Sequence, residues 1–470
     1  MKNKYLFITL IAFIVFLGIT INYYLTNGYE ITYIAKNNIT ASSPMLNDDN
    51  EVLLPVAYLE YDMNKVYWGF INLDGEVAIS LKYDDVSPFD ENYLAIVMRN
   101  NKYGLINTKD VKVIDIDYDT IQYMGEGIYY LAKNNQGSLR KYNINTKSFQ
   151  TLKEATYDFV SSFRESLAYV VKNNKLGYIN TLGDIVIPLD YEYQEGFNFH
   201  FYNGYAFIKK NGKFGIIDKS NSIILNPQLD EVMNDYILKL DYKKIYLEGY
   251  DYVPYRIDNK WGYITRSGQV LINPTYLEAY PYVHNNLARV KLFANNYYNF
   301  IDKNGQLLNN QKYKEANDFY QGFAMVSFGE GKEGLINSNG IMVIDANKDY
   351  IGYVNQSHIL VIDNSISKYY HINDVNNESK VIKISYYLGD DMTDCNVMLA
   401  TDDKINYAIL NLSGQRILPE ITVKSYEQIR VYGKNYIALV AYEKKANLEY
   451  YTYLDSLGNL LWKVYKENDT

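Results

Sequence analysis

The chain has 470 residues and a formal net charge of −9, and charged residues make up 21% of it. Lysine and arginine form no long run, so the basic footprint of a nucleic-acid-binding domain is not visible in the sequence. A single cysteine, Cys395, excludes an internal disulfide and a Cys-x-x-Cys metal site. The 52 tyrosines, against 9 prolines and 28 glycines, favour half-buried β-strands.

The first element in chain order is an uncharged apolar run, YLFITLIAFIVFLGITINYYL, at residues 5–25. At about 1.5 Å per residue a helix of this length spans the ~30 Å hydrocarbon core of a bilayer. Lys2 and Lys4 precede it and Lys36 is the first positive charge after it, which predicts a cytoplasmic N-terminus (residues 1–4) and an extracytoplasmic remainder. A cleaved signal peptide is the alternative, although no convincing small-x-small cleavage site follows the run. Residues 26–50 turn polar and are expected to form a tether.

The rest of the chain, residues 51–470, repeats one pattern, clearest in KWGYITRSGQVLINPTYLEAY at residues 260–280. With Gly262 as position zero, the pattern occurs eleven times in all, at separations of 35 residues (Gly69 to Gly104) to 47 residues (Gly215 to Gly262). The position-zero residues are Gly69, Gly104, Tyr142, Gly177, Gly215, Gly262, Asn299, Gly334, Tyr370, Ala408 and Thr452.

Three further columns test the alignment. Two residues after position zero the chain always has Ile or Leu, and the next residue is Asn, Asp or Thr, whose side chain can bond a turn backbone. Six residues after position zero, all copies but one have Gly, Asn or Asp, which tolerate the positive φ of a tight hairpin turn. This turn column consists of Gly75, Asp110, Ser148, Gly183, Asn221, Gly268, Gly305, Gly340, Asn376, Gly414 and Gly458.

Each copy predicts a three-stranded meander. An aromatic residue such as Trp68 or Trp261 precedes position zero in most copies, and with the Ile or Leu column it gives a first strand of period two. A second strand leads to a tyrosine column, and a third strand carries an Ala-x-Val pattern before the next copy begins. The tyrosine column contains Tyr83, Tyr118, Tyr191, Tyr276 and Tyr313.

The segments NNKLGYINTLGDIVIPLDY (173–191) and DNKWGYITRSGQVLINPTY (258–276) resemble the WG-repeat family of bacterial proteins. The Trp that defines the family is present only at Trp68 and Trp261. The resemblance implies a β-repeat fold, plausibly propeller-like, without an agreed activity, cofactor or catalytic residue. Propellers usually have ~4–8 blades of four strands, which eleven three-stranded copies fit poorly, so an open stack of repeats is the alternative. The longest gap between copies makes residues 230–258 a possible seam.

No residue pattern predicts a catalytic, cofactor or metal site. The Trp-Gly pairs are interpreted as packing positions, at which Gly permits close approach of another strand. Asp115, Asp117 and Asp119 have the period of one strand face and leave calcium as a minor alternative. However, Asp119 matches Asp84 of the preceding copy, and the Gly of a calcium loop is missing.

Residues in the repeat columns are expected to pack within the fold. A binding surface is therefore expected where aromatic residues fall outside these columns. Tyr252, Tyr255, Tyr280 and Tyr282 meet this description and are the candidate binding surface. The sequence therefore predicts a membrane-anchored, extracytoplasmic binding or scaffold module for a protein or envelope polymer. A cell-envelope hydrolase with a site built from loops and a passive structural spacer are the alternatives.

Overall fold

The computed structural model describes residues 52–60, 65–134, 136–152, 157–240, 244–283, 286–294, 296–353, 358–364, 366–375, 387–392, 397–401, 407–411, 415–431, 434–443, 448–455 and 457–463. The predicted anchor at 5–25 and the predicted tether at 26–50 lie outside these ranges. Within them, no helix is both long and apolar enough to cross a membrane. The chain divides into two compact units, Met1–Ile121 with Tyr386–Thr470 (unit 1) and Gln122–Ser385 (unit 2).

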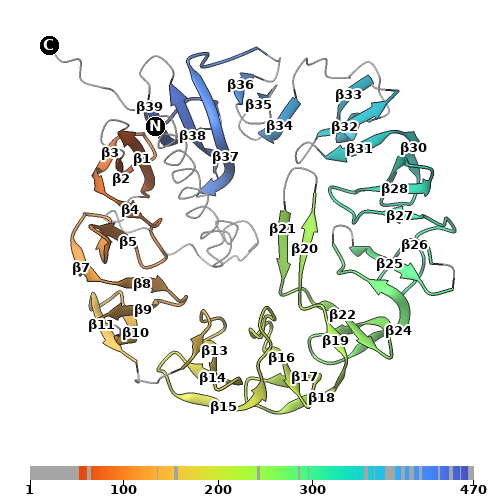
Figure 1. Cartoon of the computed structure of the whole chain (residues 1–470), viewed down its shortest axis with the longest axis horizontal. Coiled ribbons are helices and arrows are strands. Elements are labelled where there is room, and N and C mark those ends of the chain that lie inside the picture. Colours follow the sequence, from red (N-terminus) through yellow and green to blue (C-terminus); the bar gives the residue numbers. More distant parts are fainter. Residues whose placement is uncertain are drawn as a thin grey trace, which may run out of the picture. The chain divides into compact units, whose positions relative to one another are not determined.

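Unit 1 consists of antiparallel strands from both ends of the chain (Figure 1). Its strands are β1 (Leu54–Glu60), β2 (Lys65–Ile71), β3 (Val77–Tyr83), β4 (Asp85–Val86), β5 (Leu94–Arg99), β6 (Lys102–Asn107), β7 (Lys112–Tyr118), β34 (Tyr387–Met392), β35 (Val397–Thr401), β36 (Ala408–Asn411), β37 (Ile421–Val431), β38 (Lys434–Glu443) and β39 (Leu448–Leu454). Strand β1 pairs with both β2 and β39, so the first and last copies share one six-stranded sheet.

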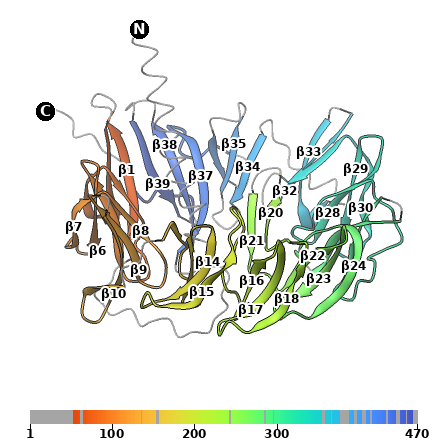
Figure 2. The same cartoon turned by 60° about the horizontal axis from the view of Figure 1, so that its bottom comes forward.

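Unit 2 contains the sheets of the central copies, in which successive strands lie side by side, as β16 to β18 do in Figure 2. Its strands are β8 (Thr120–Tyr123, which begins in unit 1), β9 (Ile128–Lys133), β10 (Gln136–Asn143), β11 (Ser148–Thr151), β12 (Phe159–Val160), β13 (Leu167–Lys172), β14 (Lys175–Asn180), β15 (Ile185–Glu192), β16 (Tyr205–Lys210), β17 (Lys213–Asp218), β18 (Ile223–Leu229), β19 (Glu231–Val232), β20 (Asp235–Lys239), β21 (Lys244–Glu248), β22 (Tyr252–Ile257), β23 (Lys260–Thr265), β24 (Val270–Ala279), β25 (Ala288–Leu292), β26 (Tyr298–Ile301), β27 (Glu315–Ala316), β28 (Phe323–Gly329), β29 (Lys332–Asn337), β30 (Met342–Lys348), β31 (Tyr350–Tyr353), β32 (His358–Asp363) and β33 (Ile366–His371). The 3-10 turn η3 (Ile372–Asp374) follows β33.

The structure confirms an all-β repeat, and every position-zero residue lies on a strand. The sheets are out of phase with the sequence repeat. Val97, on the third strand of the first copy, pairs with Gly104 on the first strand of the second copy. Several sheets also contain a short extra strand, such as β4, β12 or β27, at the edge next to the Ala-x-Val strand. Those sheets therefore have four strands, the number in a propeller blade, where the sequence predicted three.

Glycine at position zero is required by a bulge in the neighbouring strand. Between β14 and β15 the register shifts between Leu176 and Tyr178, at Gly177, and the backbone of β15 lies close to this residue. A Cβ atom on Gly177 would lie 2.6 Å from the carbonyl oxygen of Ile187 and 2.8 Å from backbone atoms of Pro188. The Gly of each Trp-Gly pair is thus a close-approach position, as its packing interpretation predicts.

Two copies without this glycine use a side chain in its place. Asn299, which is 1% exposed, donates from Nδ2 to the carbonyl oxygens of Asn309 and Gln311 at 3.0 and 2.7 Å. Thr452 is fully buried and donates from Oγ1 to the carbonyl of Trp462 at 2.7 Å. A polar side chain therefore links the two segments that a glycine otherwise allows to touch, which explains why these degenerate copies keep the frame.

The turn column behaves as predicted. Positive φ occurs at each described member of the column except Ser148, and at Gly268 it is 85°. The preceding Asn/Asp column bonds the turn backbone: Oδ1 of Asn180 accepts from the amides of Leu182 and Asp184 at 2.9 and 3.0 Å. The turn members Asn376 and Gly414 lie outside the described residues.

The third copy is shifted by two residues from its predicted register. The turn backbone there bonds to Oδ1 of Asn143, not to the predicted Asn145, and positive φ falls on Lys147. Tyr142 is 8% exposed and takes the buried place of the Ile column, whereas Ile144 is 44% exposed in the turn. The position-zero residue of this copy is therefore Arg140 and not Tyr142, which also makes the spacing to its two neighbours nearly equal.

The tyrosine column connects consecutive copies. The hydroxyl of Tyr83 donates to Oδ1 of Asp110, the turn residue of the next copy, at 2.5 Å. Tyr313 is fully buried, and its hydroxyl accepts from Nδ2 of Asn309, which also donates to the carbonyl of Gly340 in the next turn. These tyrosines lie in apolar clusters, and their hydroxyls reach the polar turns at the cluster edge.

The segment at 230–258 contains an inserted hairpin, β20–β21, which forms a two-stranded sheet of its own. The division between the two compact units does not fall there. The hairpin is inserted between β19 and β22. It packs against β28 to β32, which belong to copies much later in the sequence.

Candidate binding site

Tyr255 is placed on strand β22 and not in a loop. It is 2% exposed and pairs with Gly262. It stands as far before Gly262 as Val97 stands before Gly104, so the sequence contained the signal that this residue belongs to the Ala-x-Val frame. The prediction that Tyr255 offers a binding surface is wrong, because its side chain fills the core.

Tyr252 and Tyr282 form a half-buried aromatic group with Tyr263. The ring centroid of Tyr282 lies 5.7 Å from that of Tyr252 and 4.9 Å from that of Tyr263. The Tyr282 hydroxyl donates to the carbonyl of Asp302 at 2.9 Å, and the ammonium of Lys303 lies 4.6 Å from the Tyr252 ring centroid. Because Asp302 and Lys303 belong to the next repeat's turn, this group also joins two copies.

Tyr280 belongs to a network around Glu278. The hydroxyls of Tyr280 and Tyr298 donate to Oε2 of Glu278 at 2.8 and 2.9 Å, and Nζ of Lys291 donates to Oε1 at 3.0 Å. Burial alone would raise the pKa of Glu278, but these contacts outweigh it and hold the pKa below its usual value. Tyr280 is thus fixed by a charged partner and is not a freely moving loop residue.

Arg289 connects Tyr280 to a buried carboxylate. Its guanidinium lies 3.7 Å from the Tyr280 ring centroid, and its Nε donates to Oδ1 of Asp318 at 2.9 Å. A third contact runs from Nη1 to the carbonyl of Ala316 at 2.8 Å. Burial opposes the charge on Arg289, but Asp318 outweighs burial and raises the pKa of the guanidinium above its usual value. Asp318 is only 6% exposed, so this is a buried ion pair that needs each of its hydrogen bonds.

The inserted hairpin takes part in this network. The hydroxyl of Tyr236, on β20, donates to Oδ2 of Asp318 at 2.6 Å. Burial and the Asp318 charge raise the pKa of Tyr236 well above its usual value. Tyr236 therefore fastens the start of the hairpin to the loop that follows β27.

The end of the hairpin is fastened by Glu248. Nη2 of Arg164 donates to Oε1 of Glu248 at 2.5 Å, and Nδ2 of Asn198 donates to Oε2 at 3.1 Å. Burial would raise the pKa of Glu248, but the Arg164 charge and the hydrogen bonds from Tyr202 and Arg164 outweigh it and lower this pKa. His200 lies beside the cluster, where burial and then the Arg164 charge lower the pKa of the imidazole to about 4.

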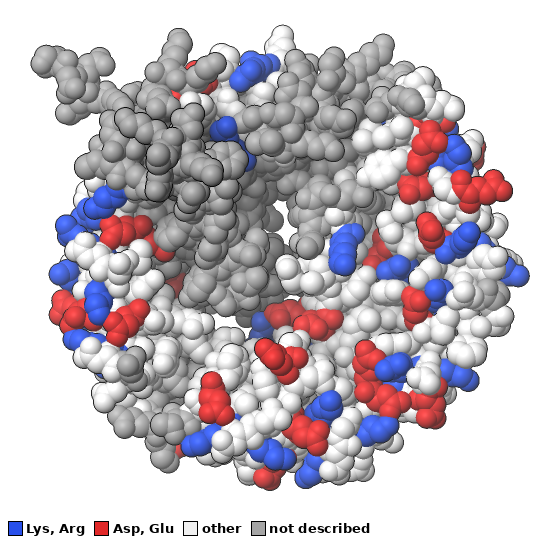
Figure 3. Space-filling model, viewed as in Figure 1, with Lys and Arg blue, Asp and Glu red and all other residues white. Residues whose placement is uncertain are grey.

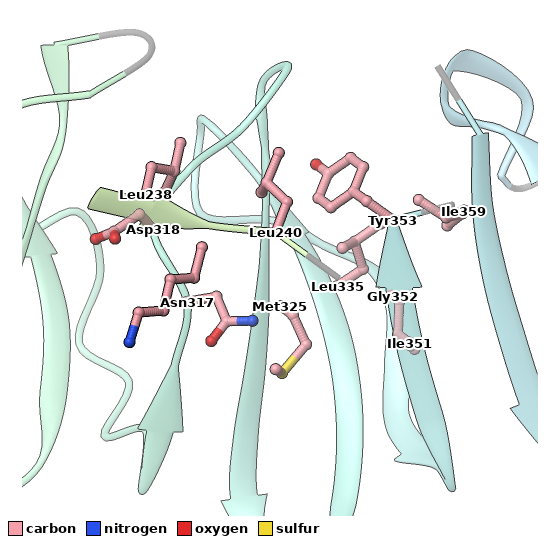
Figure 4. Close-up of a pocket in the computed structure, with 11 residues that line it drawn as sticks. Leu238, Leu240, Asn317, Asp318, Met325, Leu335, Ile351, Gly352, Tyr353 and Ile359 are labelled. Atoms are coloured by element: carbon pink, nitrogen blue, oxygen red, sulfur yellow. The ribbon is translucent and has the colours of Figure 1, made fainter. Parts of the chain in front are cut away.

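The underside of the hairpin packs on apolar residues of β28 to β32. Leu238 is 2% exposed and belongs to one cluster with Leu335, Ile351 and Tyr353. Figure 4 shows Leu238 and Leu240 on one side of a cavity of about 20 Å³. This volume holds about one water molecule, so the cavity belongs to the packing beneath the hairpin and is too small for an organic ligand.

The opposite side of the hairpin carries one exposed apolar pair between charged residues of the two strands. Ile237 and Tyr246 are cross-strand partners, 37% and 52% exposed. Ile237 on β20 and Tyr246 on β21 therefore point toward solvent, whereas the underside of the hairpin is covered by β28 to β32. The sequence reasoning placed the insertion near the binding surface but did not single out this pair, because its facing depends on the hairpin register.

The described residues contain no group of three or more His, Cys, Asp or Glu arranged to hold a metal ion. Asp119 accepts from Nζ of Lys102 at 2.5 Å, as its match to Asp84 in the repeat frame suggests. Cys395 lies outside the described ranges. On the face of unit 2 in Figure 3, acidic and basic side chains are interspersed over the described residues and form no large single-sign patch.

Six segments of the chain match the WG-containing repeat family, at residues 68–103, 103–136, 144–175, 177–214, 261–298 and 300–331. The chain belongs to the WG-repeat family. The matched segments include the copies at Gly69, Gly104, Gly177 and Gly262, whose glycines are close-approach positions. The family match assigns no catalytic residue to these segments.

No curated protein matches the chain. Among solved structures, it is similar to one described as a crystal structure of the eukaryotic initiation factor, with 8% identity, 77% of this chain and 95% of the other covered, and a TM-score of 0.35. It is also similar to the computationally designed Ika8 protein, with 10% identity, coverages of 62% and 95%, and a TM-score of 0.25. The dihydro-heme d1 dehydrogenase NirN in complex with DHE has 12% identity, coverages of 72% and 78%, and a TM-score of 0.26. Similarities this weak support no argument about fold or activity.

Proposed function

We propose that this WG-repeat protein is a non-catalytic binding module that is anchored in the cell membrane and presents its repeats outside the cytoplasm. The observation that carries the binding proposal is the exposed apolar pair Ile237 and Tyr246, on an inserted hairpin that the repeat frame does not require. Exposed aromatic side chains contribute strongly to interfaces because they bury a large area at little conformational cost. A protein is the partner class that we propose, and an envelope polymer is the alternative. A propeller-like set of sheets and an open stack stay predictions about the larger arrangement.

The half-buried tyrosines of the surface predicted from the sequence have a secondary role in partner binding in this proposal. Tyr252 begins β22, Tyr280 and Tyr282 follow the end of β24, and all three remain partly accessible. Each is also bonded or stacked against a neighbouring residue, so replacing one of them disturbs packing as well as any contact with a partner. Replacing Ile237 and Tyr246 on the hairpin therefore tests partner binding with less effect on the stability of the fold.

The binding proposal is tested by crosslinking the full chain to its partners in intact cells and identifying what is retained. The double variant Ile237→Ser with Tyr246→Ser should lower recovery of the specific partner at least tenfold and leave the Tm nearly unchanged. The matched control is Ile223→Ser with Phe159→Ser, an aliphatic and an aromatic side chain that are 57% and 43% exposed elsewhere in unit 2. Equal recovery by both double variants would mean that the hairpin is not the docking surface. Turnover of envelope glycans or peptides by the purified chain would replace the binding proposal with the hydrolase alternative.

The anchor proposal rests on the uncharged run at 5–25 and on Lys2 and Lys4 before it. The full chain should fractionate with integral membrane proteins, and protease added to intact cells should digest the repeats. Digestion only after lysis would contradict this topology.

A further inference from the structure

The outer edges of two repeat sheets, at β15 and β18, are protected against pairing with other chains. Strands β15 and β18 are the last strands of their sheets and contain Pro188 and Pro227. Both strands also shift register opposite the position-zero glycine. Proline removes a donor and a bulge bends the edge, and natural sheets use both devices to prevent edge-to-edge association.

Strand β21 lacks both devices. Among the described strands it pairs only with β20, in continuous register from Asp235 opposite Glu248 to Lys239 opposite Lys244. Its sequence, KIYLE, contains no proline, and Ile245 and Tyr246 at its centre favour strands. A two-stranded hairpin of this kind is marginal by itself, and within the described part of the chain one row of backbone groups on β21 has no strand partner.

The two strands of the hairpin are covered unequally. Leu238, on β20, is 2% exposed, whereas its partner Ile245 on β21 stays half-buried although it faces the same side. Leu247 is half-buried in the same way. Figures 1 and 2 both show β20 between β21 and β28, so β21 is the strand that faces away from the sheets beneath the hairpin.

We propose that the free edge of β21 accepts an extended segment of a protein partner as a third strand. The incoming backbone would pair with β21, and its inward apolar side chains would cover Ile245 and Leu247. Among polymers, an extended polypeptide presents N–H and C=O groups at the rise of about 3.4 Å per residue that matches this edge. The inference rests on the proposed binding function and specifies how its hairpin site recognises a partner.

The probe is an octapeptide of alternating valine and threonine, added to the full chain. Two analogues carry N-methyl groups on the odd or on the even amides and so differ only in which row of donors is blocked. The parent peptide should bind and slow hydrogen exchange of amides in β21. One N-methyl analogue should bind like the parent, with its methyl groups toward solvent, and the other should bind at least tenfold more weakly.

Three results would overturn the inference: no binding of the parent peptide at millimolar concentration, equal binding of all three peptides, or slowed exchange confined to amides outside 244–248. As a second test, Ile245→Lys should weaken binding of the parent peptide at least tenfold, whereas Ile223→Lys, at an exposed position on β18, should not. Capture of a cellular partner without protection of β21 would overturn edge pairing alone. Peptide pairing at β21 without any cellular partner would instead count against the proposed function.

Discussion

The hydroxyl of Tyr191 donates a hydrogen bond to Oδ1 of Asn221 at 2.7 Å, and this contact joins the end of one repeat to the turn of the next. Tyr83 makes the same contact with Asp110. The tyrosine column is therefore an inter-repeat connection as well as part of the core. In repeat proteins such interface contacts determine how cooperatively the array unfolds.

Replacing Tyr191 with Phe should lower stability by about 1 kcal/mol, the usual contribution of one hydrogen bond. The ring and its burial are kept, so the loss reports the hydroxyl. The control is Tyr276→Phe, because the turn residue of the following copy is Gly305, which has no side-chain acceptor. Denaturant unfolding should give the larger loss for Tyr191→Phe, and equal losses would mean that the turn contact is not stabilising.

Replacing Gly177 with Ala should destabilise the protein by about 2 kcal/mol or more, because the new methyl group meets backbone atoms that cannot move aside cheaply. The reverse change at a copy that already has alanine, Ala408→Gly, should cost only about 0.5–1 kcal/mol through backbone entropy. Thermal unfolding of the two variants measures the difference. A mild effect of Gly177→Ala would contradict the close-approach role of position zero.

The turn column predicts a different order of substitutions at Gly268, where φ is +85°. Gly268→Val should cost more than about 1 kcal/mol, since a β-branched residue is strained at positive φ. Gly268→Asn should be milder because Asn tolerates this region. Both changes add a Cβ near Ile224, so the comparison isolates the backbone strain. Equal shifts in Tm would show that backbone conformation is not the cause.

Removing the carboxylate of Asp318 should loosen the inserted hairpin. Asp318→Ala leaves the Arg289 guanidinium buried without its ion pair, a change that costs about 3–5 kcal/mol at buried pairs. Tyr236→Phe removes one hydrogen bond to the same carboxylate and should cost about 1 kcal/mol. Hydrogen exchange should become faster at β20 in both variants, and more so in Asp318→Ala. Unchanged exchange at β20 would mean that apolar packing alone holds the hairpin.

His200 gives a pH dependence. Its pKa is lowered to about 4, chiefly by burial, whereas an unfolded histidine titrates near pH 6.5. Between these values the unfolded chain takes up a proton that the folded chain does not, so stability should fall as the pH drops from about 6.5 toward 4. Nuclear magnetic resonance should show a His200 midpoint near 4, and His200→Phe should reduce the loss of stability over this interval. A midpoint near 6.5 would show that the ring is solvated.

The sequence by itself determined the repeat and most of its local structure. Glycines at position zero and in the turn column, and the Asn/Asp column between them, are local signals, because backbone conformation and short-range hydrogen bonds depend on neighbouring residues. The one error of register, Tyr142 instead of Arg140, arose in a copy without glycine in either column. Tyr255 was misplaced for a related reason: the insertion before it interrupted the spacing, although its distance to Gly262 is regular.

Only the tertiary structure decided where long-range contacts form. The pairing of β1 with β39 and of Tyr236 with Asp318 joins residues far apart in the chain, and no periodicity specifies such pairs. Whether an aromatic residue of the insertion is exposed depends on which side of the hairpin meets β28 to β32. Tyr246 and Tyr236 stand on the same hairpin, yet one faces solvent and the other a buried carboxylate, because alternate residues of a strand point to opposite sides and the rest of the fold determines which side is covered.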